Sequence, residues 1–218
     1  GPFHDSLFGN AELIVASPGV AVAGPACDPA VARAVAQGKK FVGDVELFAW
    51  EQIELAKQAE GKRPKMIGIT GSNGKSTVTA MAAAMCRAAG LQTVMAGNIG
   101  LPVLEALDNR ETLGKDPDVW VLELSSFQLE TTHHLHAAAA TVLNLSEDHL
   151  DRYATLEDYA ATKARVFTGL AATGLALLDA GDPWTPYFQA RVPRGRTLLV
   201  DGPPNIPGHT ANIPGPGH

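Results

Sequence analysis

A chain of 218 residues is long enough for one large domain or two small ones, and 45% hydrophobic with 18% charged residues is typical of a folded protein rather than a disordered one. The formal net charge of -6 gives no electrostatic reason to expect a nucleic-acid partner, and no apolar run is long enough to cross a bilayer. Cys27 and Cys86 lack metal-ligand spacing and indicate a reducing compartment, so we expect a cytoplasmic protein.

The first 60 residues predict a short β-α-β-α segment that is too small to be a comfortable domain by itself. Asp28 is a suitable helix N-cap, and Pro29 fits the first helical position that follows it. The segment contains in order a strand, a helix, a strand and a helix, predicted at residues 12–16, 29–37, 39–42 and 46–59. Residues 61–64, Gly-Lys-Arg-Pro, then predict a linker.

Residues 66–77 join a short apolar strand to a glycine loop that ends in Lys-Ser-Thr. Gly71 and Gly74 allow a sharp turn and a close approach to phosphate oxygens, and the loop amides point at the anion. Lys75 would add a positive charge at the outer phosphates of ATP, and a following hydroxyl would reach magnesium. The full P-loop pattern has glycine where this chain has Ile69, so the loop is a shortened variant. The alternative is an ordinary strand–turn–helix connection, but the adjacent Gly-Lys-Ser-Thr favours ATP binding.

The rest of the chain alternates near-continuous apolar strands with helices, which predicts an α/β fold with a parallel sheet covered by helices on both faces. The strands are predicted at residues 66–70, 91–95, 118–124, 139–145 and 174–178, and the helices at 75–89 and 155–167. Ligands of such sheets collect at the carboxyl ends of the strands. The Pro- and Gly-rich residues 201–218 predict an irregular tail.

Polar side chains follow two of the predicted strands. Glu123 lies at the tip of one strand, where a carboxylate next to a P-loop could hold magnesium or could simply cap the strand end. His149 lies in a loop dense in polar residues, 144–152, and could be a metal ligand, a proton-transfer group or a structural histidine.

Other basic side chains carry no such signal. We expect the run formed by His133, His134 and His136 to be an exposed helix end rather than a metal site, because no acidic partner is nearby in the sequence. Lys163 lies in the middle of a predicted helix, where a solvated lysine is the ordinary expectation.

Six segments occur in the order seen in the Mur ligases, and the chain resembles that family from about Glu12 to Phe167. The segments are Leu-Ile-Val-Ala-Ser-Pro-Gly-Val (13–20), Val-Gly-Asp-Val-Glu-Leu-Phe (42–48), Ile-Thr-Gly-Ser-Asn-Gly-Lys-Ser-Thr (69–77), Gly-Asn-Ile-Gly-Leu-Pro (97–102), Leu-Glu-Leu-Ser-Ser-Phe-Gln-Leu-Glu (122–130) and Asn-Leu-Ser-Glu-Asp-His-Leu-Asp-Arg-Tyr (144–153). The segment 122–130 is similar to the branch of the family that adds D-glutamate.

The resemblance implies a role for each matching residue. The ATP phosphates would be bound by Gly71, Ser72, Asn73, Gly74, Lys75, Ser76 and Thr77. Two magnesium ions would be held by Ser76, Glu123, His149 and Lys163, the last as a carbamate, which replaces the expectation of a solvated lysine. The residues implied in catalysis are Lys75, Asn98, His149 and Lys163, with Asn98 near the muramoyl substrate and the reacting phosphate.

The activity that the resemblance implies is ATP-dependent addition of D-glutamate to UDP-N-acetylmuramoyl-L-alanine in peptidoglycan precursor synthesis. The alanyl carboxylate would attack the γ-phosphate of ATP to give an acyl phosphate, and the amine of D-glutamate would then displace phosphate to form the amide. Catalysis would consist of positioning and charge neutralisation. We expect a monomer.

The resemblance also implies how the chain is divided. Residues 1–60 match only the last part of a Rossmann-like UDP-binding domain, and 65–200 match part of the ATP-binding central domain. Nothing resembles the family's third domain. We therefore expect the 218-residue chain to bind nucleotide without completing the reaction.

Two other functions compete with this one. Another amide ligase, such as a folylpolyglutamate synthetase, would share the P-loop, but the segments 42–48 and 122–130 argue against it. A nucleotide-binding module without catalysis would fit the missing segments, whereas an intact site is favoured by the presence of Lys75, Glu123, His149 and Lys163.

Overall fold

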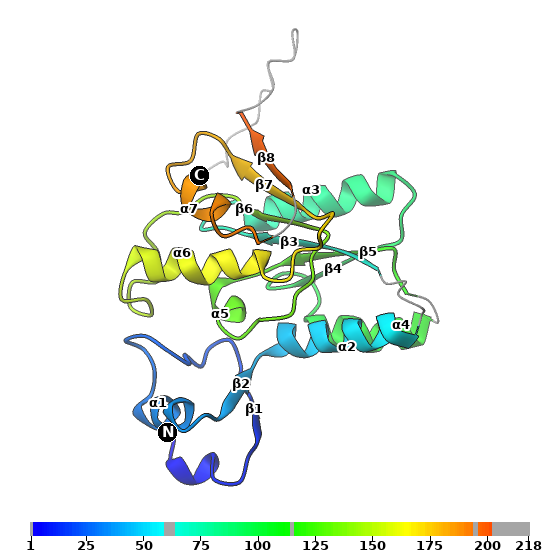
Figure 1. The fold of residues 1–218 in the computed structure, drawn as a ribbon. Coiled ribbons are helices and arrows are strands. Elements are labelled where there is room, and N and C mark those ends of the chain that lie inside the picture. Colours follow the sequence, from blue (N-terminus) through cyan, green and yellow to red (C-terminus); the bar gives the residue numbers. More distant parts are fainter. Residues whose placement is uncertain (1, 59–63, 114–115, 194–195, 202–218) are drawn as a thin grey trace, which may run out of the picture.

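A computed structural model describes residues 2–58, 64–113, 116–193 and 196–201 (Figure 1). The predicted linker at 61–64 lies outside these residues except for Pro64, and the predicted tail at 201–218 lies outside them except for Asp201.

Residues 2–43 form a small N-terminal lobe at one end of the molecule (Figure 1). It contains a 3-10 turn η1 (Asp5–Leu7), strand β1 (Leu13–Val15), helix α1 (Pro29–Ala36) and strand β2 (Lys40–Val42). The two strands pair in parallel, with Ile14 opposite Phe41. Asp28 caps α1 as predicted, because its Oδ1 accepts the amide of Ala30 at 2.8 Å.

The body of the molecule is a six-stranded sheet with the order β4-β5-β3-β6-β7-β8, and every neighbouring pair is parallel. The strands are β3 (Lys65–Thr70), β4 (Thr93–Gly97), β5 (Val119–Glu123), β6 (Ala139–Val142), β7 (Leu175–Asp179) and β8 (Arg196–Val200). The order places β3 between β5 and β6, so the glycine loop that follows β3 lies at the middle of the sheet. The predicted parallel sheet is confirmed.

Helices cover both faces of this sheet, as the sequence predicted (Figure 1). One face packs on α3 (Lys75–Ala88) through a cluster that includes Ile69, Ala83 and Val121. The other face packs on a larger set of elements, namely α2 (Asp44–Gln58), α4 (Val103–Leu113), α5 (Ser126–Leu129), α6 (Leu156–Ala164), the 3-10 turn η2 (Arg165–Phe167) and α7 (Thr185–Gln189). The core of that larger layer includes Trp120, whose ring meets that of Phe48 edge-on at 5.1 Å between centroids.

The structure also contains elements that the sequence did not predict. The short helix α5 depends on a capping box between Ser125 and Gln128 rather than on a hydrophobic period. Strand β8 has exposed apolar side chains and gains its strand structure by pairing with β7. Helix α2 begins at Asp44 rather than at the predicted Glu46. Within the described residues, no helix combines the length and apolarity required to span a bilayer.

Replacing Gly97 by alanine will destabilise the fold far more than replacing Gly90 by alanine. Both glycines have positive φ, +114° and +81°, so an alanine at either position costs about 1–2 kcal/mol of backbone strain. A Cβ at Gly97 would also lie 2.2 Å from the carbonyl oxygen of Glu123, whereas Gly90 has no atom within 4 Å. We expect the free energy of unfolding, measured in urea, to fall by more than about 3 kcal/mol for Gly97→Ala. Equal losses in the two variants would contradict the crowding at Gly97.

Candidate functional site

The glycine loop lies between the carboxyl end of β3 and the first turn of α3. Gly71 has φ +153°, and a Cβ there would meet the Cβ of Leu143 at 3.0 Å. Gly74 has φ +79° and immediately precedes α3. Ser76 and Thr77 are exposed in the first turn of the helix. The exposed residues at the start of α3 therefore form a helix N-terminus whose backbone amides and hydroxyl groups are suited to an anion.

The segment that follows β6 holds this loop in place. The carbonyl oxygen of Asn144 accepts the amide of Ser72 at 3.0 Å, and its Oδ1 accepts the amide of Asn73 at 2.9 Å. The Ser72 hydroxyl accepts the amide of Ser146 at 3.0 Å and is itself buried. Ser72 and Asn73 therefore contribute to the rigidity of the loop through these bonds.

Two lysine ammonium groups converge on one carbonyl oxygen of the loop. Lys75 Nζ and Lys163 Nζ each donate to the Gly71 carbonyl at 2.9 Å, and Lys75 also donates to the Ser72 carbonyl at 2.9 Å. Lys163 is only 1% exposed and lies 4.4 Å from the centre of the Tyr159 ring. Its burial, together with repulsion from Lys75, lowers the pKa of Lys163 from 10.5 to about 7. The expectation of a solvated lysine at 163 is wrong.

Glu123 is the last residue of β5, and only one oxygen of its buried carboxylate accepts a hydrogen bond within the described residues. Its Oε1 accepts Asn98 Nδ2 at 2.8 Å, and its backbone oxygen accepts the Asn98 amide, also at 2.8 Å. Its Oε2 is buried without a hydrogen-bond partner in the described residues. Register pairs Glu123 with Ile69 of β3, so the carboxylate lies one strand away from the glycine loop. An unpaired buried carboxylate oxygen is costly, and a magnesium ion is a ligand of the right charge and hardness for it.

His149 lies in the loop after β6 with φ +54°, which is unusual for a residue other than glycine. Its ring is 4.7 Å from the ring of Phe127 and 6.2 Å from that of Tyr159, and its Nε2 is 3.4 Å from Asp148 Oδ2. The side chain of His149 is 41% exposed, so it is accessible to a ligand. Because Lys163 also contacts the Tyr159 ring, His149 and Lys163 lie around the same aromatic side chain.

These residues could bind a magnesium ion only if water or substrate phosphates supply the rest of its coordination sphere. Within the described residues, no three His, Cys, Asp or Glu side chains gather closely enough to hold a metal ion by themselves. Magnesium usually keeps several waters and uses one or two carboxylates plus substrate phosphates. The unpaired oxygen of Glu123 and the exposed hydroxyl of Ser76 meet that requirement, since both border the loop that would hold the phosphates.

The sequence did not single out Tyr159, which the structure places at the centre of this site. Its hydroxyl lies 3.5 Å from the Ser72 hydroxyl, and its ring contacts both Lys163 and His149. Its place four residues before Lys163 on one helix face is the only signal that could have suggested this.

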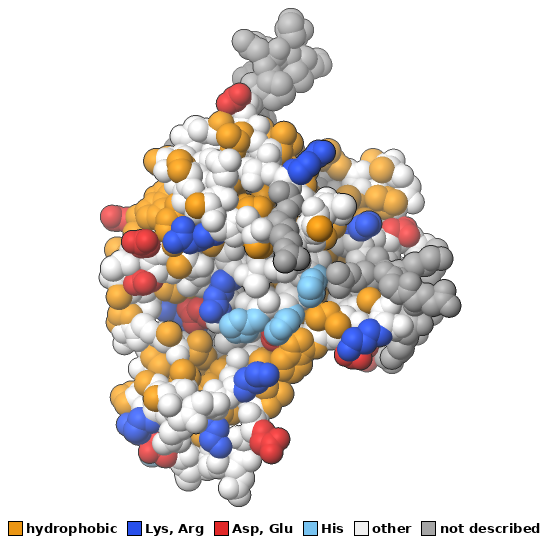
Figure 2. Space-filling view, viewed as in Figure 1, with side chains coloured by type: hydrophobic (Ala, Val, Ile, Leu, Met, Phe, Trp, Pro, Cys, Tyr) orange, Lys and Arg blue, Asp and Glu red, His pale blue; other side chains and the backbone are white. Residues whose placement is uncertain are grey.

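His133 and His134 are exposed, as expected, but the premise that no acidic partner is nearby is wrong. The two residues lie in the loop after α5 and have an acidic partner, because Glu46 of α2 accepts both of their amides at 2.6 and 3.1 Å and His134 Nδ1 at 2.5 Å. Burial of Glu46 would raise its pKa, but these hydrogen bonds outweigh the burial and hold the pKa below its usual value. Figure 2 shows histidine side chains (pale blue) gathered where the N-terminal lobe meets the body of the molecule.

Comparisons with known proteins agree on one family. Residues 69–199 match the Mur ligase middle domain. The chain is 57% identical over 182 residues to the UDP-N-acetylmuramoylalanine–D-glutamate ligase of Chromobacterium violaceum, covering 84% of this chain and 37% of that protein. It is 51% identical over 203 residues to the enzyme of the same name from Methylobacillus flagellatus, covering 93% of this chain and 40% of that protein.

A solved structure of UDP-N-acetylmuramoyl-L-alanyl-D-glutamate–2,6-diaminopimelate ligase shares the fold with a TM-score of 0.58 at 19% identity. That match covers 91% of this chain and 48% of the solved chain. The chain therefore spans less than half the length of each of these three proteins.

The buried ammonium of Lys163 will make the stability of the chain depend on pH. The folded-state pKa of about 7 lies below the unfolded value of 10.5, so the penalty for burying the charge is complete below pH 7 and disappears as the pH rises to 10.5. In buffer without carbon dioxide or metal, Lys163→Met will therefore stabilise the fold relative to the wild type most at low pH. The advantage will shrink by up to roughly 1.4 kcal/mol per pH unit across that window.

The measurement is urea unfolding of both chains at several pH values, with Lys57→Met as the control. Lys57 is exposed and, within the described residues, forms its ion pair with the exposed Glu54, so its replacement should shift the free energy of unfolding little and equally at each pH. Parallel pH profiles for the wild type and Lys163→Met would contradict the lowered pKa.

Proposed function

The chain belongs to the Mur ligase family, and on that premise we propose that it serves the ATP-dependent joining of D-glutamate to UDP-N-acetylmuramoyl-L-alanine in peptidoglycan precursor synthesis. The observation that carries the proposal is the unpaired carboxylate oxygen of Glu123 one strand away from the glycine loop at the start of α3. We place this activity in the cytoplasm and expect a monomer.

The residues of the glycine loop would hold the ATP phosphates. The amides at the start of α3 provide donors, and Lys75 provides a charge that already lies within the loop. This positioning would direct the γ-phosphate towards the substrate carboxylate, and the resulting acyl phosphate would be attacked by the amine of D-glutamate. The residues proposed to contact the phosphates are Gly71, Ser72, Asn73, Gly74, Lys75, Ser76 and Thr77.

Magnesium bound here would neutralise charge on the transferring phosphoryl group. Its proposed protein ligands are Ser76, Glu123, His149 and Lys163. Asn98 is oriented by two hydrogen bonds to Glu123, so its side chain is held at the same strand end, where it would meet the muramoyl substrate. In this arrangement Glu123 serves both the metal and the substrate contact.

Lys163 would enter this site as a carbamate. With a pKa of about 7, a substantial fraction of its amine is unprotonated at neutral pH and can attack the carbon of carbon dioxide. A bond forms between Nζ and that carbon, one C=O bond becomes C–O⁻, and the proton on nitrogen is released. The product is an anion beside Lys75, so the repulsion between the two ammonium groups becomes attraction.

We expect Lys75→Ala to abolish nucleotide binding by the 218-residue chain, since it removes the loop's own cation. Binding of Mg-ATP is measured by isothermal titration calorimetry, with Lys57→Ala as a control at an exposed site on α2. Unchanged affinity in Lys75→Ala would contradict the assignment of the loop. Ligation is then assayed as D-glutamate-dependent phosphate release, for the 218-residue chain and for the full-length gene product.

These assays separate the two candidate functions. Phosphate release by the full-length product that needs both D-glutamate and the UDP-linked substrate supports the ligase. Tight ATP binding without any such release would instead support a nucleotide-binding module. Release by the 218-residue chain alone would overturn the expectation that this chain does not turn over.

Carbamate formation on Lys163 predicts a labelled product. In isotopically labelled bicarbonate, the chain will show a carbamate carbonyl signal by NMR that is lost in Lys163→Arg, since arginine stays protonated. Lys75→Arg, which keeps the neighbouring charge, should retain the signal. A spectrum without the signal in the wild type at pH 8 would contradict the proposal.

A further inference from the structure

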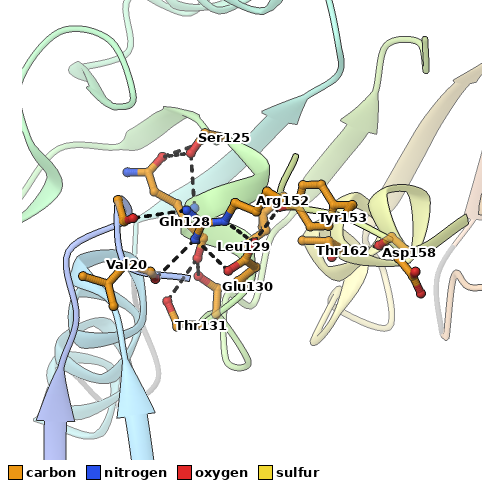
Figure 3. Close-up of polar contacts among 12 residues, drawn as sticks. Val20, Ser125, Gln128, Leu129, Glu130, Thr131, Arg152, Tyr153, Asp158 and Thr162 are labelled. Carbon is orange, nitrogen blue, oxygen red and sulfur yellow. Dashed lines mark hydrogen bonds and ion pairs between the residues drawn. The ribbon is translucent and has the colours of Figure 1, made fainter. Parts of the chain in front are cut away.

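A buried ion pair joins Arg152, in the same loop as His149, to Glu130 close to Val20 of the N-terminal lobe (Figure 3). Arg152 Nε donates to Glu130 Oε1 at 2.8 Å and Nη2 donates to Oε2 at 2.7 Å, so the pair is bidentate. The hydroxyl of Tyr153 also donates to Glu130 Oε1 at 2.7 Å. The side chains of Arg152 and Glu130 are only 6% and 8% exposed.

The remaining donors of Arg152 reach the N-terminal lobe. Nη1 donates to the carbonyl of Gly19 at 3.4 Å, and Nη2 donates to the carbonyl of Val20 at 3.3 Å. The backbone of the same residue packs against the lobe as well, because a Cβ on Gly24 would lie 2.4 Å from the carbonyl oxygen of Arg152. Arg152 is therefore bonded to a loop more than 130 positions earlier in the chain.

The guanidinium of Arg152 also contacts Phe127, whose ring in turn contacts the ring of His149. The guanidinium carbon lies 4.0 Å from the centre of the Phe127 ring, and that ring lies 4.7 Å from the ring of His149. The amide of Arg152 also donates to the carbonyl of His149 at 2.9 Å, so the two residues are joined by a backbone hydrogen bond as well. Phe127 therefore contacts both side chains, and its ring is tilted by 53° relative to the ring of His149.

We propose that Arg152 is a positioning residue that couples the 17–20 loop of the N-terminal lobe to the orientation of His149, with Glu130 fixing the guanidinium. This inference rests on the proposed function, because it gives His149 a role that needs a defined orientation. A planar guanidinium can meet a carboxylate, two carbonyls and an aromatic face at once, and a lysine ammonium cannot. The role of Arg152 is therefore geometric as well as electrostatic.

The test is Arg152→Lys in the full-length gene product. We expect kcat for ligation to fall by at least about 10-fold and the KM for the UDP-linked substrate to rise, because small displacements of positioned groups cost that much. The KM for ATP should stay within about twofold, since the bonds that Arg152 makes within the described part of the chain include none to the glycine loop. Kinetics equal to those of the wild type, at a temperature where both proteins are folded, would overturn the proposal.

Glu46→Gln is the matched control. Glu46 is a second buried carboxylate that bonds a distant segment, at His133 and His134, and among the described residues none of its hydrogen bonds reaches Phe127 or His149. It should lower the melting temperature and leave the kinetic constants unchanged. A loss of kcat equal to that of Arg152→Lys would show a general structural effect and would contradict the specific role.

A double variant provides a second test in case Arg152→Lys does not fold. Arg152→Met with Glu130→Met removes both charges together, which cores often tolerate, while removing one alone leaves a buried unpaired charge. The proposal expects a folded protein with the same kinetic defect. Wild-type kinetics in the double variant would overturn it.

Hydrogen exchange separates this proposal from the proposed function. In the 218-residue chain, Arg152→Lys should raise amide exchange in both the 17–20 loop and the segment 146–150, and Glu46→Gln should raise it in neither. If the wild-type full-length product shows no ligation, the proposed function fails, and exchange alone decides the coupling. Exchange that rises in only one of the two segments would refute the coupling.

Discussion

The site depends on the contact in which two ammonium groups share the carbonyl oxygen of Gly71. Lys75 and Lys163 lie at 2.9 Å from that oxygen, and their mutual repulsion adds to the cost of burying Lys163. One carbonyl dipole cannot neutralise two positive charges. The loop is thus prepared for an anion, and any anion that binds there gains from relieving the repulsion. Burial is the main cause of the lowered pKa of Lys163, and the repulsion from Lys75, which would also favour a bound phosphate, lowers that pKa further.

The order of the strands brings the remaining groups to the same place. Because β3 lies between β5 and β6, the Leu124 amide donates to Ile69 at 2.8 Å on one side, and the Leu143 amide donates to Thr70 at 2.9 Å on the other. These two hydrogen bonds continue the pairing of the strands by one residue beyond the ends of β5 and β6. The acidic end of β5 and the loop after β6 therefore start at fixed positions on either side of the glycine loop. Parallel strands produce this convergence without any direct bond between Glu123 and His149.

Much of this could be predicted from local sequence, and the rest could not for a physical reason. The caps Asp28 and Thr155 were predicted because they act within three residues, and the structure confirms that each accepts an amide of its own helix. The environment of Lys163 was not predictable from its own helix alone, since its hydrogen-bond acceptor, the carbonyl of Gly71, lies about 90 positions earlier. The pairing of Glu46 with His134, 88 positions apart, was missed for the same reason. For Lys163, the resemblance to a family implied a role that local sequence patterns could not. The structure adds that this lysine is buried and lies close to the charge of Lys75.

The Arg152–Glu130 pair shows why a buried ion pair can matter more for geometry than for stability. Taking two charges out of water offsets most of their attraction, so a well-packed hydrophobic pair would hold the two segments together about as well. A hydrophobic pair, however, could not bind the carbonyls of Gly19 and Val20, which would then be left without these donors at the junction of the lobe and the body. Nor could it present a flat charged face to Phe127, whose position sets the surface on which His149 rests. The hydrogen bonds of Arg152 to the N-terminal lobe and its contact with Phe127 therefore couple the orientation of His149 to that lobe. A displacement of the lobe would alter the orientation of His149 through these contacts and not through the sheet.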